Sequence, residues 1–230
     1  MGSTNSATAL RRSPVIQAPA ITAVRVKEPL LKRPIDFLLS TLMLALCMPL
    51  SLLIAIAIRL EDGGPVFFRQ ERWGWGGLPF RVYKFRTMVP DADQKYGLKE
   101  AREKDHRITK MGRLLRASGL DELPQLINIC KGEMSFVGPR ALAVGELVAD
   151  GNGGHQSYEH VPGFRERLAV RPGLTSLATI FIPKDSTRRR KFRYDLLYIR
   201  RLSVRLDLYL IALSFWISFR GKWETRGSKV

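Results

Sequence analysis

The sequence has little cysteine and little histidine, with two cysteines and three histidines in 230 residues. Cys47 and Cys130 lie far apart without C-x-x-C spacing, so neither a disulfide framework nor a zinc knuckle is expected, and the domain fits a reducing compartment. His106, His155 and His160 do not recur at metal-ligand spacing, so we expect them to be exposed loop histidines.

Glycine-rich nucleotide loops are also missing. Gly74, Gly76 and Gly77 do not complete G-x-G-x-x-G, and they are not followed by the G-K-[ST] ending of a P-loop. They lie between two short β-rich runs, residues 66–68 and 80–85. This arrangement predicts a β-hairpin closed by a glycine-rich turn.

Acidic residues are few, with 21 Asp and Glu against 38 Lys and Arg and a formal net charge of +17. Such an excess points to anionic partners, which include nucleic acid, phosphorylated small molecules and the anionic lipid of a cytoplasmic leaflet. Charge alone does not choose among them. The hydrophobic content of 45% excludes a wholly disordered protein, and the length allows one domain with a real core.

The chain divides into three parts by composition. Residues 1–28 are rich in Ser, Thr, Ala and Pro without an apolar period, and we expect a disordered tail there. An amphipathic transit peptide is the weaker alternative, because prolines interrupt any such helix. Residues 29–60 are expected to form a membrane segment, and residues 61–230 a cytosolic domain.

Residues 34–58 are almost wholly apolar, which is enough to cross a bilayer at about 20 residues per crossing. Pro49 interrupts this run near its middle, and Asp36 lies in its first turn. Positive charges at both ends disfavour a crossing, because cations prefer the cytoplasmic side. We therefore favour a re-entrant helix-break-helix hairpin over a transmembrane anchor or an uncleaved signal segment. The flanking cations are Lys32, Arg33 and Arg59.

The centre of the sequence is the stretch 118–126, where two adjacent carboxylates follow a cationic segment. Residues 90–117 predict a solvated helix and then a basic one. Apolar residues at helical spacing after Asp121 and Glu122 predict a new helix that begins at this pair, with Pro124 in its first turn. The closing stretch, residues 204–219, is short for a crossing and predicts an interfacial helix.

The two carboxylates allow two interpretations. They could cap a helix, or they could be oxygen ligands for Mg²⁺, which typically binds one or two carboxylates and substrate phosphates. Arg113 and Arg116 precede the pair, and Arg140 and Arg171 each stand beside a rigid Pro-Gly or Gly-Pro turn. Arginines offset phosphate charge, and a helix start adds partial positive charge. Phosphoryl chemistry at a membrane surface is the hypothesis that follows.

Several ordered motifs resemble the bacterial sugar transferases, which are monotopic phosphoglycosyl transferases. The likeness covers nearly everything after residue 30, and its specificity comes from the order of many motifs together. The matching segments are 32–36, 64–70, 83–88, 120–126, 131–140, 171–175, Tyr194-Asp195 and Asp207.

With the elements above, this resemblance implies an α+β fold. The expected domain is membrane-associated and monotopic, with a re-entrant hairpin, a short β-hairpin and several surface or interfacial helices. It would lie at the cytoplasmic face of a bacterial inner membrane. There it would transfer a sugar 1-phosphate from a UDP-sugar to polyprenyl phosphate and release UMP, as the first membrane step in assembling an exopolysaccharide, O-antigen, capsule or glycoprotein glycan.

The resemblance also implies roles for particular residues. Asp121 would be the nucleophile that carries a covalent phosphosugar and the ligand of a Mg²⁺ cofactor, and Glu122 would assist it as a base or a positioning group. The implied phosphate-binding residues are Arg116, Arg140, Arg171, Lys84 and Arg86. The implied membrane anchor consists of Lys32, Arg33, Asp36 and Pro49.

The sequence departs from the family pattern at two places. Met48 stands where the family often has Ser before the proline, and residues 176–183 differ from the usual segment after Thr175, which affects sugar and nucleotide recognition. No further membrane domain precedes residue 29, so we expect the minimal catalytic form. A membrane-tethered basic binding protein and an inactive transferase scaffold are the alternatives. We expect membrane lipid and no nucleic acid as partners, and homodimer formation stays open.

Overall fold

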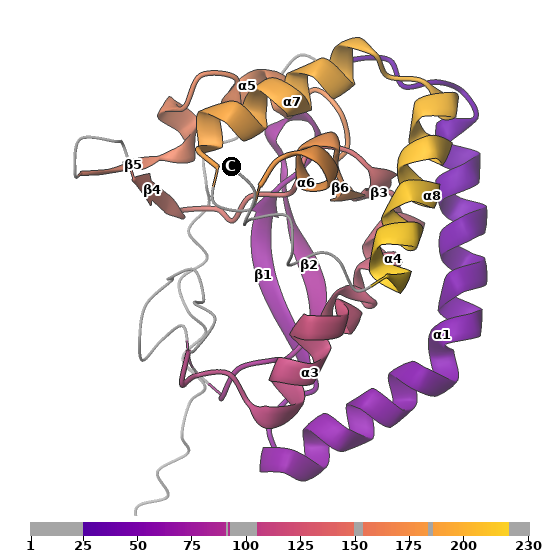
Figure 1. Cartoon of the computed structure of the whole chain (residues 1–230), viewed down its shortest axis with the longest axis vertical. Helices are drawn as coiled ribbons and strands as arrows, with labels where there is room; N and C mark the ends of the chain where they lie inside the picture. Colours follow the sequence, from indigo (N-terminus) through magenta and orange to yellow (C-terminus); the bar gives the residue numbers. More distant parts are fainter. Residues whose placement is uncertain (1–24, 91, 93–104, 150–153, 184–185, 221–230) are drawn as a thin grey trace, which may run out of the picture.

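The computed structural model describes residues 25–90, 92, 105–149, 154–183 and 186–220 (Figure 1). Most of the expected disordered tail and most of the expected solvated helix before residue 105 lie outside this range. The helices are α1 (Lys32–Asp62), α3 (Lys110–Ser118), α4 (Gln125–Lys131), α5 (Phe164–Arg167), α6 (Leu177–Phe181), α7 (Arg188–Arg200) and α8 (Val204–Phe219). The strands are β1 (Phe67–Trp73), β2 (Pro79–Phe85), β3 (Ser135–Val137), β4 (Leu147–Ala149), β5 (His155–Ser157) and β6 (Gly173–Thr175). One-turn 3₁₀ helices are η1 (Trp75–Gly77), η2 (Leu120–Glu122) and η3 (Tyr158–His160).

Helix α1 is one continuous helix with Pro49 inside it. Figure 1 shows it changing direction about halfway, with its first half beside α8 and its second half running to α3. Proline has no N–H, so the helix loses the hydrogen bond to the carbonyl of Ala45, and the ring pushes that turn open. The expected break is therefore a bend in one helix and not an interruption between two.

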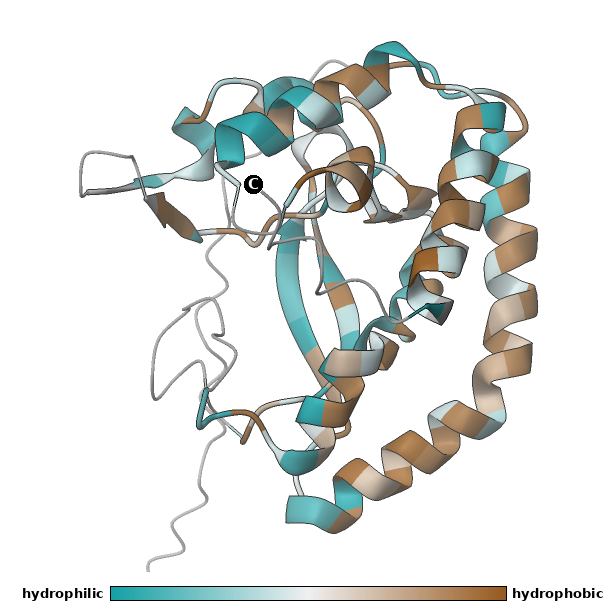
Figure 2. Ribbon diagram, viewed as in Figure 1, coloured by the Kyte–Doolittle hydropathy of each residue, from teal (hydrophilic) through white to brown (hydrophobic). Residues whose placement is uncertain are grey.

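Most of the α1 surface is apolar and uncovered by the rest of the protein. In the part of the chain that the structure describes, it is the helix with the length and composition to cross a membrane, and only 11% of its most apolar window is buried. Figure 2 shows this apolar character along both halves of the helix. Leu46 and Met48, beside the bend, are 71% and 66% exposed. An exposed apolar surface of this extent indicates an interaction with lipid or another protein.

The predicted β-hairpin is confirmed. Strands β1 and β2 pair antiparallel, with Phe67 opposite Phe85 and Trp73 opposite Pro79, and η1 closes the turn. Gly76 has a φ of 70° within that turn, a conformation that costs a side chain with a Cβ. The first strand is longer than the sequence pattern indicated, because it continues as far as Trp73.

A second pairing brings two distant arginine-bearing turns together. Strands β3 and β6 are parallel, with Ser135 opposite Gly173. A Cβ on Gly138 would lie 2.3 Å from the carbonyl oxygen of Arg171, so only glycine allows this approach. The turns that precede Arg140 and follow Arg171 thus pack directly against each other.

The main core lies between the hairpin, the β3–β6 pair and helices α4, α7 and α8. Its most enclosed members are Ile129, Val137 and Leu210, all at 0% exposure. Helix α8 buries Leu210 and Ile217 in this core while Phe215 and Trp216 stay about half exposed. The predicted limits of the closing helix are confirmed, and α8 runs beside the first half of α1 (Figure 1).

Candidate active site

The two carboxylates lie in a tight turn, and the expectation that an α-helix begins at Asp121 is wrong. Gly119 ends α3 with a φ of 72°, and Asp121 and Glu122 then occupy the 3₁₀ turn η2. Proline supplies the physical reason: in a helix begun at Asp121, Pro124 would have to donate an N–H to Leu120. The carbonyl of Leu120 instead accepts from the N–H of Leu123 at 3.2 Å, and α4 begins only at Gln125.

Lys84 of β2 stands directly beside both carboxylates. Its Nζ lies 2.5 Å from Oε1 of Glu122 and 3.7 Å from Oδ2 of Asp121. The side chains of Lys84 and Asp121 are only 16% and 14% exposed. Among the described residues, no group donates a hydrogen bond to the carboxylate of Asp121. Glu122 is therefore fixed by a close partner, whereas Asp121 is held more loosely.

The surroundings shift the two carboxyl pKa values in opposite directions. Burial raises the pKa of Asp121 above its ordinary value, and the Glu122 charge adds to the rise, although Lys84 opposes it. Burial would also raise the pKa of Glu122, but the charges of Lys84 and Arg140 outweigh it and lower this pKa to about 2. The carboxylate of Asp121 is thus the more basic of the two.

Two of the predicted arginines lie at this site. Arg116, from the last turn of α3, donates from Nε to Oγ1 of Thr87 at 2.9 Å, and its charge acts on Asp121. Nη2 of Arg140 lies 3.5 Å from Oε1 of Glu122, and the Arg140 side chain is 48% exposed. Basic side chains from β2, α3 and the turn after β3 therefore lie around the two carboxylates, which suits an anionic substrate.

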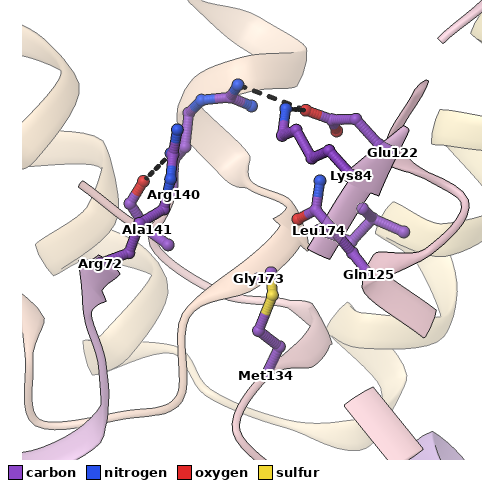
Figure 3. Close-up of a pocket in the computed structure, with 9 residues that line it drawn as sticks. All are labelled: Arg72, Lys84, Glu122, Gln125, Met134, Arg140, Ala141, Gly173 and Leu174. Carbon is purple, nitrogen blue, oxygen red and sulfur yellow. Dashed lines mark hydrogen bonds and ion pairs between the residues drawn. The ribbon is translucent and has the colours of Figure 1, made fainter. Parts of the chain in front are cut away.

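A small hollow opens next to Glu122 (Figure 3). Figure 3 shows Arg72 and Arg140 on one side of it and Lys84, Glu122 and Gln125 on the other. Arg72 and Gln125 were not predicted from the sequence, because nothing in the strand pattern separates Arg72 from the other arginines of the hairpin. The lining residues are Arg72, Lys84, Glu122, Gln125, Met134, Arg140, Ala141, Gly173 and Leu174.

Arg86 and Arg171 do not line this hollow. Arg86 is almost fully buried and forms an ion pair with Asp62, while its Nε donates to the carbonyl of Pro65 at 2.6 Å. Arg171 forms an ion pair with Glu28 and donates from Nε to the carbonyl of Gly132 at 2.9 Å. Phosphate binding by these two arginines stays a prediction, and their present partners connect segments that are distant in the sequence.

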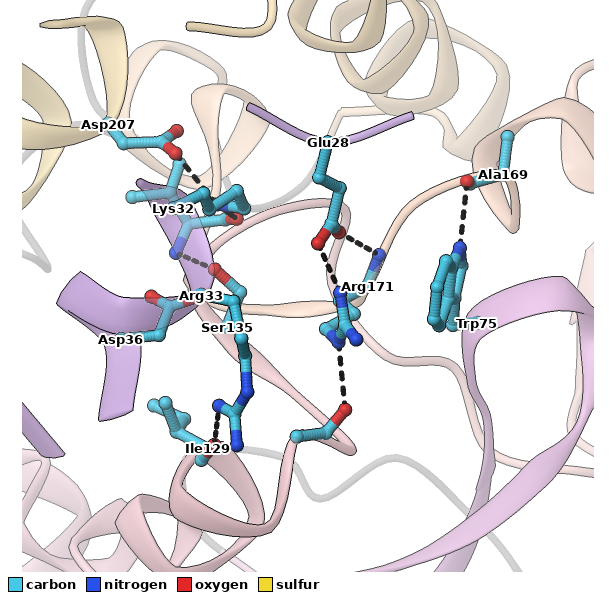
Figure 4. Close-up of polar contacts among 12 residues, drawn as sticks. Glu28, Lys32, Arg33, Asp36, Trp75, Ile129, Ser135, Ala169, Arg171 and Asp207 are labelled. Atoms are coloured by element: carbon cyan, nitrogen blue, oxygen red, sulfur yellow. Dashed lines mark hydrogen bonds and ion pairs between the residues drawn. The ribbon is translucent and has the colours of Figure 1, made fainter. Parts of the chain in front are cut away.

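Figure 4 shows Arg171 between Glu28 and the Trp75 ring. The guanidinium carbon lies 4.2 Å from the centre of that ring, and the indole N–H donates to the carbonyl of Ala169 at 3.0 Å. Arg25 lies over the same ring, 4.4 Å from its centre. This stacking attaches the segment before α1 to the turn of the hairpin.

The residues predicted as a membrane anchor connect the start of α1 to the core (Figure 4). Nζ of Lys32 lies 2.7 Å from Oδ2 of Asp207 on α8 and donates to the carbonyl of Val137 at 3.0 Å. Arg33 donates to the carbonyls of Ile129 and Cys130, both at 2.6 Å. These contacts complete the carbonyls at the end of α4 and fix the direction in which α1 leaves the domain.

Asp36 belongs to the same attachment. Its Oδ1 accepts from the N–H of Phe136 at 3.2 Å, and its Oδ2 is buried without a hydrogen-bond partner among the described residues. Pro49 lies farther along α1, at the bend. A direct role of these residues at the membrane stays a prediction.

The donor set fits Mg²⁺. The described residues hold no group of three or more His, Cys, Asp or Glu side chains that could form an all-protein metal site. Asp121 and Glu122 supply two adjacent carboxylates, and Mg²⁺ ordinarily takes one or two carboxylates together with substrate phosphates. A metal ion at this position would need the substrate to complete its ligands.

These features form a basic site that suits an anionic ligand, next to a bent and exposed apolar helix. The chain belongs to the bacterial sugar transferase family, whose model matches residues 27–221. That match includes the hairpin, the carboxylate pair, both arginine-bearing turns and α8.

The similar proteins with curated names agree with the family. The chain is 41% identical to a UDP-glucose:undecaprenyl-phosphate glucose-1-phosphate transferase of Klebsiella pneumoniae, over 83% of this chain and 40% of the relative. It is 40% identical to a protein of the same name from Caulobacter vibrioides, over 81% of this chain and 69% of the relative. It is 38% identical to the exopolysaccharide production protein PSS of Rhizobium leguminosarum, over 79% and 91%. The chain thus spans about two fifths of the Klebsiella protein.

Proposed function

We propose that this chain transfers a sugar 1-phosphate from a UDP-sugar to polyprenyl phosphate through a covalent intermediate on Asp121, with release of UMP. The family and the names of the relatives support the donor and acceptor classes. The observation that carries the proposal is the contrast between the two carboxylates: Glu122 is paired with Lys84, whereas Asp121 accepts no hydrogen bond from the described residues and has a raised pKa.

In the first step, an oxygen of Asp121 attacks the phosphorus that bears the sugar. The bond from that phosphorus to the bridging oxygen breaks, and its electron pair leaves with UMP. The positive charges of Lys84 and Arg116 act on Asp121, and the same two groups offset the charge on the reacting phosphate. Covalent catalysis of this kind divides one displacement into two and predicts ping-pong kinetics.

In the second step, an oxygen of polyprenyl phosphate attacks the phosphorus of the aspartyl phosphosugar. The bond to Asp121 breaks, the carboxylate is restored and a diphosphate linkage forms. A phosphate monoester has a second pKa of about 6, so the acceptor is largely ionised at neutral pH and needs no base. Because Glu122 has a pKa of about 2, we assign it the positioning of Lys84 and not proton abstraction.

Asp121, with Glu122 as the second carboxylate, would hold a bound Mg²⁺, which supplies charge neutralisation to the diphosphate. The role of the chain itself is to set the direction of attack. Lys84 keeps Glu122 in place, so the looser Asp121 is the carboxylate able to turn toward phosphorus.

We place the reaction at the cytoplasmic face of a bacterial inner membrane. The exposed apolar surfaces of α1 and α8 support contact with lipid, and the cations near both ends of α1 favour return to the same face. In this proposal residues 29–60 form a re-entrant, monotopic anchor, and residues 61–230 form the cytosolic domain. The product would enter the first membrane step of glycan assembly.

The test is UMP release from a panel of UDP-sugars, with the full chain in membranes that contain polyprenyl phosphate and Mg²⁺. Steady-state release should depend on the acceptor, and Asp121→Asn should abolish it. Glu71→Gln removes a carboxylate of the hairpin outside the site and is the matched control. Release by Asp121→Asn at the wild-type rate, or no release from any UDP-sugar, would contradict the proposal.

A further inference from the structure

The segment that carries Arg140 is fixed by backbone hydrogen bonds on both sides. Before it, the carbonyl of Pro139 accepts from the N–H of Gly173 at 3.0 Å, and after it, the carbonyl of Leu142 accepts from the N–H of Trp73 at 2.9 Å. The side chain of Arg140 stays 48% exposed. A fixed backbone with an exposed guanidinium suits a preorganised anion site, since a misplacement of about 1 Å can cost about 100-fold in rate.

Between these bonds, two arginine side chains hold consecutive carbonyls of the same segment. Nη2 of Arg167, in α5, donates to the carbonyl of Arg140 at 2.6 Å. Nη1 of Arg72, in β1, donates to the carbonyl of Ala141, also at 2.6 Å (Figure 3). The hairpin, β6 and α5 therefore all hold the backbone at Arg140.

Arg167 is itself oriented by a buried partner on another helix. Its Nε and Nη2 lie 3.0 Å and 2.9 Å from Oδ2 of Asp195 in α7, and the two side chains are only 3% and 4% exposed. The guanidinium carbon also lies 4.6 Å from the centre of the Phe192 ring. These contacts set the direction of the guanidinium, and with it the position of the Arg140 carbonyl.

Folding stability does not explain this buried ion pair by itself. Replacement of such a pair by apolar residues of similar volume often leaves stability unchanged or raises it, because two charges no longer have to be desolvated. What apolar residues cannot reproduce is the hydrogen bond from Arg167 to the Arg140 carbonyl. Asp195 lies in one of the motifs that resemble the family, yet it does not line the hollow beside Glu122.

We infer that Arg167 and Asp195 are positioning residues for the transfer, which act through the backbone of Arg140. Asp195 orients Arg167, and Arg167 fixes the Arg140 carbonyl. The Arg140 guanidinium is thereby kept beside the carboxylate turn, where its Nη2 lies 3.5 Å from Oε1 of Glu122. The inference rests on the proposed function for the reaction that is affected.

The first experiment measures UMP release by the full chain in membranes, with kcat/KM for the UDP-sugar as the readout. Arg167→Met/Asp195→Leu leaves no unpaired charge, so we expect an unfolding midpoint near that of the wild-type chain. Its kcat/KM should nevertheless fall by about 10- to 100-fold, because the Arg140 backbone loses a donor. Arg165→Met removes an exposed arginine from the same short helix and should leave kcat/KM unchanged. Wild-type kcat/KM in the folded apolar variant would overturn the inference.

A double-mutant cycle distinguishes action through Arg140 from a general loss of structure, and it decides the matter if the apolar variant fails to fold. Arg167→Lys keeps the charge beside Asp195 but not the fork that also reaches the Arg140 carbonyl, and we expect a loss of about tenfold in kcat/KM. In an Arg140→Gln background the exposed guanidinium is already absent, so Arg167→Lys should cost less than about twofold more. An equal loss in both backgrounds would exclude action through Arg140.

Hydrogen exchange tests the backbone contact without any substrate. The N–H of Val144 donates to the carbonyl of Glu71 at 3.1 Å, and that of Gly173 donates to Pro139. Both amides should exchange faster in Arg167→Lys, because the segment between them loses one of its attachments. Exchange at the wild-type rate would contradict the inference. If exchange rises while no UDP-sugar releases UMP from the wild-type chain, the proposed function fails and the support of the Arg140 backbone by Arg167 stands.

Discussion

Nζ of Lys84 is 1.2 Å closer to Oε1 of Glu122 than to Oδ2 of Asp121, at 2.5 Å against 3.7 Å. The ammonium group of Lys84 thus pairs closely with one of two adjacent carboxylates and lies farther from the other. The nearer carboxylate, Glu122, has its pKa lowered to about 2. The farther one, Asp121, has a raised pKa and accepts no hydrogen bond from the described residues. The proposed division of roles, with Asp121 as nucleophile and Glu122 as positioning group, rests on this asymmetry.

The first prediction concerns the pH dependence of UMP release. The nucleophile must be ionised, so activity should fall as the pH drops through the raised pKa of Asp121. Lys84→Gln removes a charge that lowers this pKa, and the acid limb should move to higher pH, with a lower maximum rate. Glu122→Gln removes a charge that raises it, so the limb should move to lower pH. Rates of UMP release between about pH 4 and 8 measure both shifts.

Glu71→Gln is the control for charge removal, because Glu71 pairs with the exposed Arg81 on the outer part of the hairpin. Its acid limb should coincide with that of the wild-type chain. Shifts of Lys84→Gln and Glu122→Gln in the same direction would show that Asp121 is not the group that titrates.

The second prediction concerns the buried attachment of α1. Lys32→Met would leave the carboxylate of Asp207 buried without its cation, and removal of one partner from such a pair costs about 3–5 kcal/mol. The double variant Lys32→Met/Asp207→Leu removes both charges, and Tyr198 can still donate to the carbonyl of Val137 at 3.1 Å. We expect the double variant to recover most of the loss in chemical unfolding. A double variant as unstable as Lys32→Met would mean that the pair itself stabilises the fold.

Local sequence patterns predicted the elements that local interactions specify. The hairpin, the basic helix α3, the closing helix α8 and the position of the bend at Pro49 all follow from periodicity, turn residues and proline. The turn at Asp121 was mispredicted because the apolar period continues upstream of Pro124, while the hydrogen bond to Leu120 excludes an α-helix there. The spacing of apolar residues carries no information about the backbone N–H that Pro124 lacks.

The rest depends on contacts between distant parts of the chain. The parallel pairing of β3 with β6 joins two three-residue strands, each too short to give a period. Arg171 matches a phosphate-binding motif, yet its nearest anion is Glu28, which the composition assigned to a disordered tail. Arg72 differs from Arg69 and Arg81 only in what the fold places around it. Burial of this kind cannot be read from one strand.

The third prediction tests the packing that positions Arg116. A Cβ on Gly112 would lie 2.0 Å from the carbonyl oxygen of Thr87, so Gly112→Ala must separate α3 from the segment after the hairpin. The bond from Arg116 to Oγ1 of Thr87 would then be lost. We expect a lower unfolding midpoint and a loss of at least tenfold in UMP release. Gly145→Ala, with a φ of 75° and open space around it, should cost only about 1 kcal/mol and leave activity intact.

The last prediction concerns the path of α1 through the membrane. In a chain without Cys47 and Cys130, single cysteines are introduced as Ala20→Cys before α1 and Leu78→Cys in the exposed turn after it. If α1 returns to the face it entered, an impermeant thiol reagent should label both cysteines in inside-out vesicles. Adding Pro49→Ala restores the hydrogen bond to Ala45, and the straighter helix should leave part of the Ala20→Cys chains protected. Protection of Ala20→Cys with Pro49 in place would show that α1 crosses the bilayer.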